Sequence, residues 1–248
     1  MQIKRGFYLQ QLIDGKQNGL IKIITGIRRC GKSYLLFKLF KQHLMQNGVD
    51  KNHVIQIALD DIENAELREP LALYKYIKAS MVDDNLYYIL LDEVQLVPRF
   101  EEVLNSLLRI DNADVYVTGS NSKFLSSDII TEFRGRGDEI HLYPLSFSEY
   151  CEGTGQAPAD AWKNYYTYGG LPHVLSLETD KKKLDYLNNL FESVYLIDIL
   201  ERHHIKNKEE FEELVRVIAS NIGAPTNPTK LSNTFKSIKK TAISSVTI

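Results

Sequence analysis

The stretch LIKIITGIRRCGKSYLLFKLFKQHLM, residues 20–45, decides the fold of this chain. It begins with an apolar run, passes through a loop bounded by two glycines, and ends in a segment with helical apolar spacing. Residues 26–33, GIRRCGKS, match the pattern G-x-x-x-x-G-K-[ST], in which the glycines permit a tight path that turns several N–H groups inward. A strand, this loop and a helix, in this order, predict a phosphate-binding loop.

The fixed residues of this loop have predicted roles in binding a nucleotide. Lys32 would place its ammonium against the β- and γ-phosphates, and the Ser33 hydroxyl would bind Mg²⁺. The positive end of the following helix would face the same phosphates. We therefore expect nucleotide contacts from Gly26, Ile27, Arg28, Arg29, Cys30, Gly31, Lys32, Ser33 and Tyr34. The side chains of Arg28 and Arg29 are expected to point to solvent or to a partner.

Composition is that of an ordinary globular protein. The 248 residues are 44% hydrophobic and 25% charged, which is enough for one large domain or for an ordinary domain with a smaller one. The net charge of −2 gives no overall attraction for polyanions and leaves a local basic face open. The N-terminus lacks an apolar signal core, and the apolar runs are too short to cross a bilayer. We expect a cytoplasmic protein without membrane contact.

The two cysteines, Cys30 and Cys151, indicate no disulfide framework and fit a reducing compartment. Cys30 lies inside the phosphate loop, where Lys32 and the helix N-terminus would lower the pKa of a reactive thiol. The commoner alternative is a small residue that fills the loop.

Strand-like and helical segments alternate over residues 20–145. Four further strands are predicted after the first, at 53–61, 86–94, 114–121 and 138–145, and helices are predicted at 32–47, 71–81 and 100–110. This alternation predicts an α/β fold with a parallel sheet covered on both faces. From residue 146 onward the pattern is mainly helical, including 182–204 and 209–223. A Gly-, Pro- and Ala-rich joint is predicted between Cys151 and Ala161.

The segment YYILLDEVQ, residues 87–95, has the second chemical signature. Asp92 lies at the predicted carboxyl end of its strand, where parallel sheets place their ligand crevice, and it could hold the Mg²⁺ shared with Ser33. Glu93 could orient or deprotonate an attacking water. The alternative is a solvated strand end without chemistry.

Two further segments offer candidate catalytic residues. Asn121, in TGSN after the fourth strand, would contact the γ-phosphate or the water as a sensor, and Thr118 and Ser120 are alternatives within the same turn. Otherwise the segment would form an ordinary turn leaving the strand. In FRGRG, residues 133–137, Arg134 or Arg136 would neutralise transferred charge, reaching the nucleotide of a neighbouring copy of the chain. A solvated or structural arginine is the alternative.

GIRRCGKS, YYILLDEVQ, TGSN and the series FRGRG, YPLSFSEY and YGGLP together resemble prokaryotic, archaeal-type AAA-family ATPases with a winged-helix C-terminal region, which are related to signal-transducing P-loop ATPases. The resemblance implies a five-stranded ATPase core over 1–145, a helical lid over 146–207 and a partial winged helix over 208–248. It implies that Lys32 and Ser33 are the Walker A contacts and that Asp92 and Glu93 are the Walker B pair. Asn121 would be the sensor, and Arg136 and Arg134 compete as the finger.

The resemblance implies a Mg-dependent ATPase or nucleotide switch that converts ATP to ADP and phosphate, with homo-oligomers formed through the finger. KSIKKTAISSVTI, residues 236–248, ends inside the expected recognition helix, so we expect a truncated or unusually short family member. The alternative function is a DNA-binding regulator that uses nucleotide as a structural ligand. The basic cluster KSIKK, residues 236–240, would serve it, unless that cluster is solvated surface.

Overall fold

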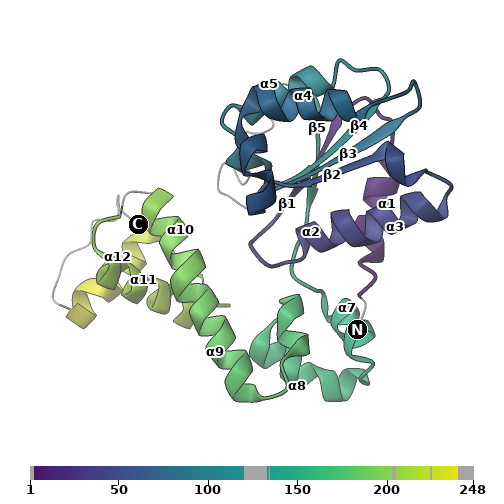
Figure 1. Cartoon of the computed structure of the whole chain (residues 1–248). Coiled ribbons are helices and arrows are strands. Elements are labelled where there is room, and N and C mark those ends of the chain that lie inside the picture. The colour runs from purple at the N-terminus through teal and green to yellow at the C-terminus, as the bar shows by residue number, and fades with distance from the viewer. Residues whose placement is uncertain (1–2, 120–132, 134, 203–204, 224, 240–248) are drawn as a thin grey trace. The chain divides into compact units, whose positions relative to one another are not determined.

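The computed structural model describes residues 3–119, 133, 135–202, 205–223 and 225–239 (Figure 1). The chain divides into two compact units, Met1–Leu184 and Asp185–Ile248. Asn121, Arg134, and the side chains of the basic cluster lie outside the described part. The division into core, lid and partial winged helix at residues 145 and 207 stays a prediction.

A five-stranded parallel sheet forms the centre of the first unit, in the order β2-β3-β4-β1-β5. The strands are β1 Ile21–Thr25, β2 Val54–Ala58, β3 Tyr87–Asp92, β4 Ala113–Thr118 and β5 Gly137–His141. Every residue of β1 and β3 is buried, as expected for strands covered on both faces. The predicted α/β fold, a five-stranded parallel sheet with helices on both faces, is confirmed.

Helices cover both faces of this sheet (Figure 1). One face carries α1 Gly6–Asp14 and a continuous helical segment made of α2 Lys32–Tyr34, a π-helical stretch Leu35–Phe40 and α3 Lys41–Gln46. The other face carries α4 Pro70–Ser80 and α5 Phe100–Leu107. The apolar side chains on each face of the sheet pack with the helices on that face, which gives two separate cores. Burial in these cores fixes which side chains of each strand point to which face.

The sequence prediction differs from the structure in three places. Helix α1 was not predicted, because its short apolar pattern precedes the phosphate loop without a capping side chain. The predicted joint between Cys151 and Ala161 is mostly helical. Helix α7, Phe147–Thr154, begins with a capping box of Ser146 and Glu149, and α8, Pro158–Tyr168, follows after three residues. The second, third and fifth strands are shorter than predicted and end at 58, 92 and 141.

The segment after β5 is tied to α8 and to the turn that follows α8 by two hydrogen bonds of the Leu145 backbone, within the first unit. Leu145 N donates to Gly170 O at 2.7 Å, and Tyr165 Oη donates to Leu145 O at 3.0 Å. A Cβ on Gly170 would lie 2.2 Å from Leu145 O, so glycine is required there. A 3₁₀ turn, Pro172–Ser176, follows and returns the chain to the phosphate loop, where Pro172 lines the same pocket as Gly31.

The described residues of the second unit are mainly helical. They comprise the end of α9 Asp180–Leu190, a π-helical stretch Phe191–Leu196, α10 Ile197–Arg202, α11 Lys208–Ser220 and α12 Pro228–Lys239. Helices α11 and α12 pack through Val217 and Leu231. A partial winged helix stays a prediction. Among the described residues, the helices are all too short or too polar to cross a membrane.

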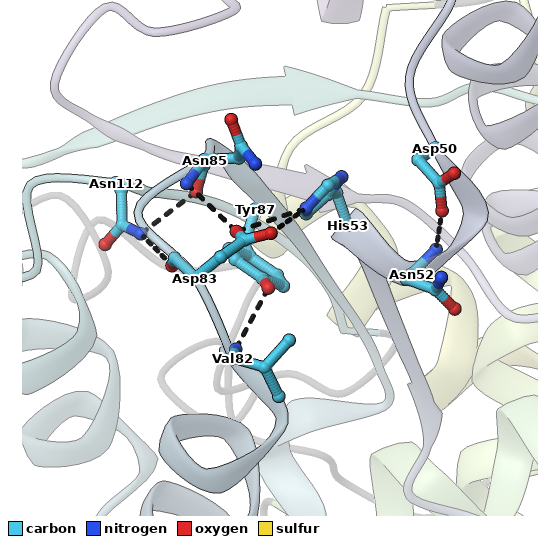
Figure 2. A network of polar contacts seen from close by, with 8 residues as sticks. All are labelled: Asp50, Asn52, His53, Val82, Asp83, Asn85, Tyr87 and Asn112. Atoms are coloured by element: carbon cyan, nitrogen blue, oxygen red, sulfur yellow. Dashed lines mark hydrogen bonds and ion pairs between the residues drawn. The ribbon is translucent and has the colours of Figure 1, made fainter.

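A polar network closes the amino edge of the sheet (Figure 2). His53 Nε2 lies 3.0 Å from Asp83 Oδ2, and Tyr87 Oη accepts a hydrogen bond from Val82 N at 3.0 Å. Asn112 Nδ2 donates to Asn85 O at 2.9 Å. The hydrogen bond from His53 is the main reason that the pKa of Asp83 falls to about 2. This network holds the loop before β3 against β2 and β4, at the edge opposite the phosphate loop.

Candidate functional site

The phosphate loop follows β1 at the carboxyl edge of the sheet and leads into α2. Gly26 has φ 136°, and a Cβ there would lie 2.2 Å from Leu142 O, so only glycine fits. Gly31 has φ 103°. Arg29 also has a positive φ, 65°, so the loop turns sharply within a few residues. The predicted backbone path of GIRRCGKS is therefore present, with glycine at the two points where the sequence pattern requires it.

Lys32 is buried and lies against its own loop. Its Nζ donates to Gly26 O at 2.9 Å and to Ile27 O at 3.0 Å. Burial lowers the pKa of its ammonium, while Asp92 and Glu93 act in the opposite direction. Because both bonds go to loop carbonyls, the ammonium stays at the mouth of the loop, where anionic ligand oxygens would compete for it.

Asp92 is brought together with Ser33 and Thr118, from three parts of the chain. Thr118 Oγ1, at the end of β4, donates to Asp92 Oδ1, and the Ser33 hydroxyl also hydrogen-bonds the carboxylate. Asp92 is 4% exposed, and burial raises its pKa against the effect of these two hydrogen bonds. The sequence predicted that Asp92 lies beside Ser33. It gave Thr118 only as an alternative sensor in the turn after the fourth strand.

Glu93 leaves β3 with a left-handed backbone, φ 55° and ψ 45°. This conformation is uncommon for a residue other than glycine and points to a functional constraint. Glu93 N donates to Thr118 Oγ1 at 3.0 Å, and Gln95 Nε2 donates to Glu93 Oε2. Thr118 and Gln95 thus fix the backbone and the side chain of Glu93. Gln95 has no sequence signal that would have identified it.

Cys30 is a buried residue of the apolar core beneath the loop. It is fully buried beside Leu35 and Leu36, and burial raises the pKa of its thiol despite the nearby charges of Lys32 and Arg5. Burial and the raised pKa therefore favour the loop-filler interpretation of Cys30 over a reactive thiol.

A pocket of about 330 Å³ lies next to the phosphate loop, within the first unit. Its walls come from the N-terminal segment, the loop and the segment around the 3₁₀ turn, and they are Ile3, Arg5, Cys30, Gly31, Tyr34, Leu145, Pro172, His173 and Ser176. Sequence reasoning found three of these as loop residues and missed the others. Of the missed residues, Leu145 and Pro172 lie in the quoted segments YPLSFSEY and YGGLP, but those segments predicted no role for them.

Arg136 lies away from this site. It directly precedes β5, its carbonyl accepts from Ile21 N at 2.9 Å, and its Nη1 donates to Asn105 Oδ1 at 3.0 Å. The loop follows the other end of β1, and a five-residue strand spans about 13 Å from first to last Cα. Arg136 therefore has no role at its own loop in this arrangement. A role for it at the nucleotide of a second copy stays a prediction.

The site fits a magnesium ion that is held jointly with a ligand. Among the described residues, no three metal-binding side chains of His, Cys, Asp or Glu type come together. Ser33 and Asp92 supply two adjacent oxygen ligands, one of them a carboxylate. Mg²⁺ characteristically takes one or two protein oxygens and completes its shell with water and substrate phosphates.

Comparisons with known proteins agree with this geometry. The family described as AAA domain matches residues 18–151, and a domain of unknown function, DUF8612, matches residues 159–248. The structure is similar to a Walker-type ATPase of Pyrococcus abyssi, with a TM-score of 0.55 and 18% identity over 98% of this chain and 86% of that one.

Two sequence relatives are uncharacterized proteins. One, from Haemophilus influenzae, is 32% identical over 95% of this chain, and one, from Methanocaldococcus jannaschii, is 28% identical over 87% of it. The matches cover 60% and 50% of those relatives, so this chain spans only part of their length.

Proposed function

This chain belongs to the AAA domain family, and from that premise we propose that it binds ATP with Mg²⁺ and hydrolyses it to ADP and phosphate. One observation carries the proposal. Lys32, Ser33 and Asp92 meet at the carboxyl edge of the sheet, and Glu93 follows directly with a constrained backbone. Family membership supports nucleotide binding, and the position of Glu93 supports turnover.

Each residue of the site has a proposed role that follows from its chemistry. The loop N–H groups and the Lys32 ammonium would bind the β- and γ-phosphates, exchanging the carbonyl contacts of Lys32 for phosphate oxygens. Ser33 and Asp92 would hold Mg²⁺, which supplies charge neutralisation between the terminal phosphates. Thr118 keeps the Asp92 carboxylate in place through its hydrogen bond.

Glu93 would orient the attacking water and accept its proton. A general base of this kind contributes about 10²- to 10⁴-fold to a rate. Its carboxylate is held by Gln95, and its backbone by Thr118, so little reorganisation is needed when substrate arrives. ATP, ADP and Mg²⁺ are thus the proposed ligands.

The test is to measure ATP affinity and phosphate release separately. Glu93→Gln should leave the Kd for Mg-ATP within about threefold and lower turnover by about 10²-fold or more. Lys32→Ala should lose both Mg-ATP binding and turnover. Glu102→Gln, which removes an exposed carboxylate on α5, is the matched control and should change neither.

The outcomes separate the candidate functions. Loss of ATP binding in Glu93→Gln would contradict the role assigned to Glu93. Tight Mg-ATP binding by the unmodified protein without phosphate release above Lys32→Ala would refute hydrolysis and leave a nucleotide switch. The proposal of a DNA-binding regulator would then be tested by nucleotide-dependent binding to duplex DNA at several salt concentrations.

A further inference from the structure

A groove lies between α4 and α5 on the outer surface of the first unit, away from the phosphate loop (Figure 1). It has a volume of about 530 Å³. Tyr74, Val103 and Ile110 give it an apolar floor that is continuous with the core beneath the helices. Leu71, which also lines it, is 56% exposed. An apolar floor inside a polar rim is typical of a surface that binds another protein.

The rim of this groove has an excess of positive charge at one end. Because α4 and α5 each lead into the next strand of a parallel sheet, they run in the same direction and end at the same edge. Glu69 stands before α4, and Lys78 lies about 13 Å further along that helix, near the end where Arg109 follows α5. Arg99 pairs with Glu102 at 3.6 Å, whereas Lys78 and Arg109 form no ion pair within the described part of the chain.

The turn after β2, residues 60–63 with the sequence DDIE, has the complementary character. Ile62 is 79% exposed and lies among three exposed carboxylates. Arg68 Nε donates to Leu59 O at 2.7 Å, and Asp61 Oδ1 accepts from Glu63 N at 3.0 Å. These hydrogen bonds fix the turn with its isoleucine in solvent, so burying that side chain against a partner would order little further chain.

We propose that the DDIE turn of one copy docks in the α4–α5 groove of a second copy, and reciprocally, in a two-fold symmetric dimer. Ile62 covers the apolar floor beside Tyr74 and Ile110, and the carboxylate of Glu63 meets Arg109 at the basic end. The dimer buries an exposed isoleucine and pairs opposite charges, which together favour this orientation over others.

The position of the two surfaces in the chain favours a second copy as the occupant. The turn leads through the 3₁₀ segment Ile62–Arg68 directly into α4, which forms one wall of the groove. Ile62 is not among the residues that line the groove of its own copy. Two adjoining and complementary patches satisfy a two-fold dimer, because one rotation places each turn in the groove of the other copy.

The experiment is sedimentation velocity on the full chain without nucleotide, at about 1–200 μM and at two salt concentrations. The unmodified protein should show a monomer–dimer equilibrium that weakens as salt is raised. Ile62→Ser should weaken the dimer by about tenfold or more. Ile222→Ser is the matched control, because Ile222 is an isoleucine that is 85% exposed in the second unit, and it should dimerise normally.

A charge exchange then tests the pairing itself. Arg109→Glu and Glu63→Arg should each weaken the dimer by about tenfold or more, and the double variant should recover most of the affinity. Both side chains are exposed, so the fold should be retained, which circular dichroism of each variant checks. A protein that stays monomeric throughout, a dimer that survives Ile62→Ser, or a double variant no tighter than the single ones would overturn the proposal. Species larger than a dimer would overturn the two-fold arrangement.

Discussion

Replacing Thr118 by valine removes one hydroxyl that serves both acidic residues of the site. Thr118 Oγ1 donates to Asp92 Oδ1 and accepts from Glu93 N at 3.0 Å, and the side chain is fully buried. Valine has nearly the same shape, so the core around it stays filled. The Asp92 carboxylate loses one of its hydrogen bonds, and Glu93 N–H loses its acceptor.

The magnitude follows from these two bonds. A hydrogen bond to a charged group contributes about 1.5–3 kcal/mol, and a buried donor left unpaired costs about 1–3 kcal/mol. The two effects share one hydroxyl and do not add fully, so we expect Thr118→Val to lower the free energy of unfolding by about 2–4 kcal/mol. Thr118→Ser keeps the hydroxyl and loses a buried methyl, which costs about 1 kcal/mol.

The assay is urea unfolding followed by circular dichroism, with Mg-ATP turnover measured on the same samples. Thr118→Val should be less stable than Thr118→Ser and should lose turnover, because the left-handed backbone of Glu93 is no longer held. Equal stabilities of the two variants, with normal turnover in Thr118→Val, would refute the reasoning that Thr118 organises Asp92 and Glu93.

Two further predictions concern the opposite edge of the sheet. Lys22 is fully buried and paired with Asp114, so Lys22→Met should lower the free energy of unfolding by about 3–5 kcal/mol, and adding Asp114→Asn should recover part of it in denaturant titrations. If the double variant is no more stable than Lys22→Met, the stability is lost through packing and not through the unpaired Asp114 carboxylate. Because the pKa of Asp83 is lowered to about 2 in the folded protein, its contribution to stability is present above its ordinary pKa and disappears as the pH falls through about 2. Unfolding midpoints between about pH 5 and pH 2 should therefore fall less steeply in Asp83→Asn than in the unmodified protein, and parallel curves would exclude this role.

Much of the fold follows from local sequence patterns. The five strands, the helix after the phosphate loop and the position of Asp92 at a strand end were predicted because apolar periodicity and chain order constrain a parallel sheet strongly. Helix α1 and the true extent of α7 and α8 were not, because tertiary packing and caps set short helices more than composition does.

The candidate site was predictable only in part. GIRRCGKS identified Lys32 and Ser33, since the loop requires glycine at fixed backbone positions. Gln95 and the six pocket residues outside the loop received no predicted role, because their places at the site depend on contacts that no local pattern encodes. Arg136 was a reasonable candidate from its Gly-rich loop, yet strand direction places it at the amino edge, away from its own phosphate loop.

The sequence by itself determined the phosphate loop, the parallel strands and the acidic pair, because backbone conformation and burial periodicity are properties of consecutive residues. Only the tertiary structure decided that Thr118 joins Asp92 to Glu93. It alone brought Arg5 to Glu149, 144 residues away. Those contacts arise when the sheet and its helices pack, so they depend on the whole fold and not on any one segment.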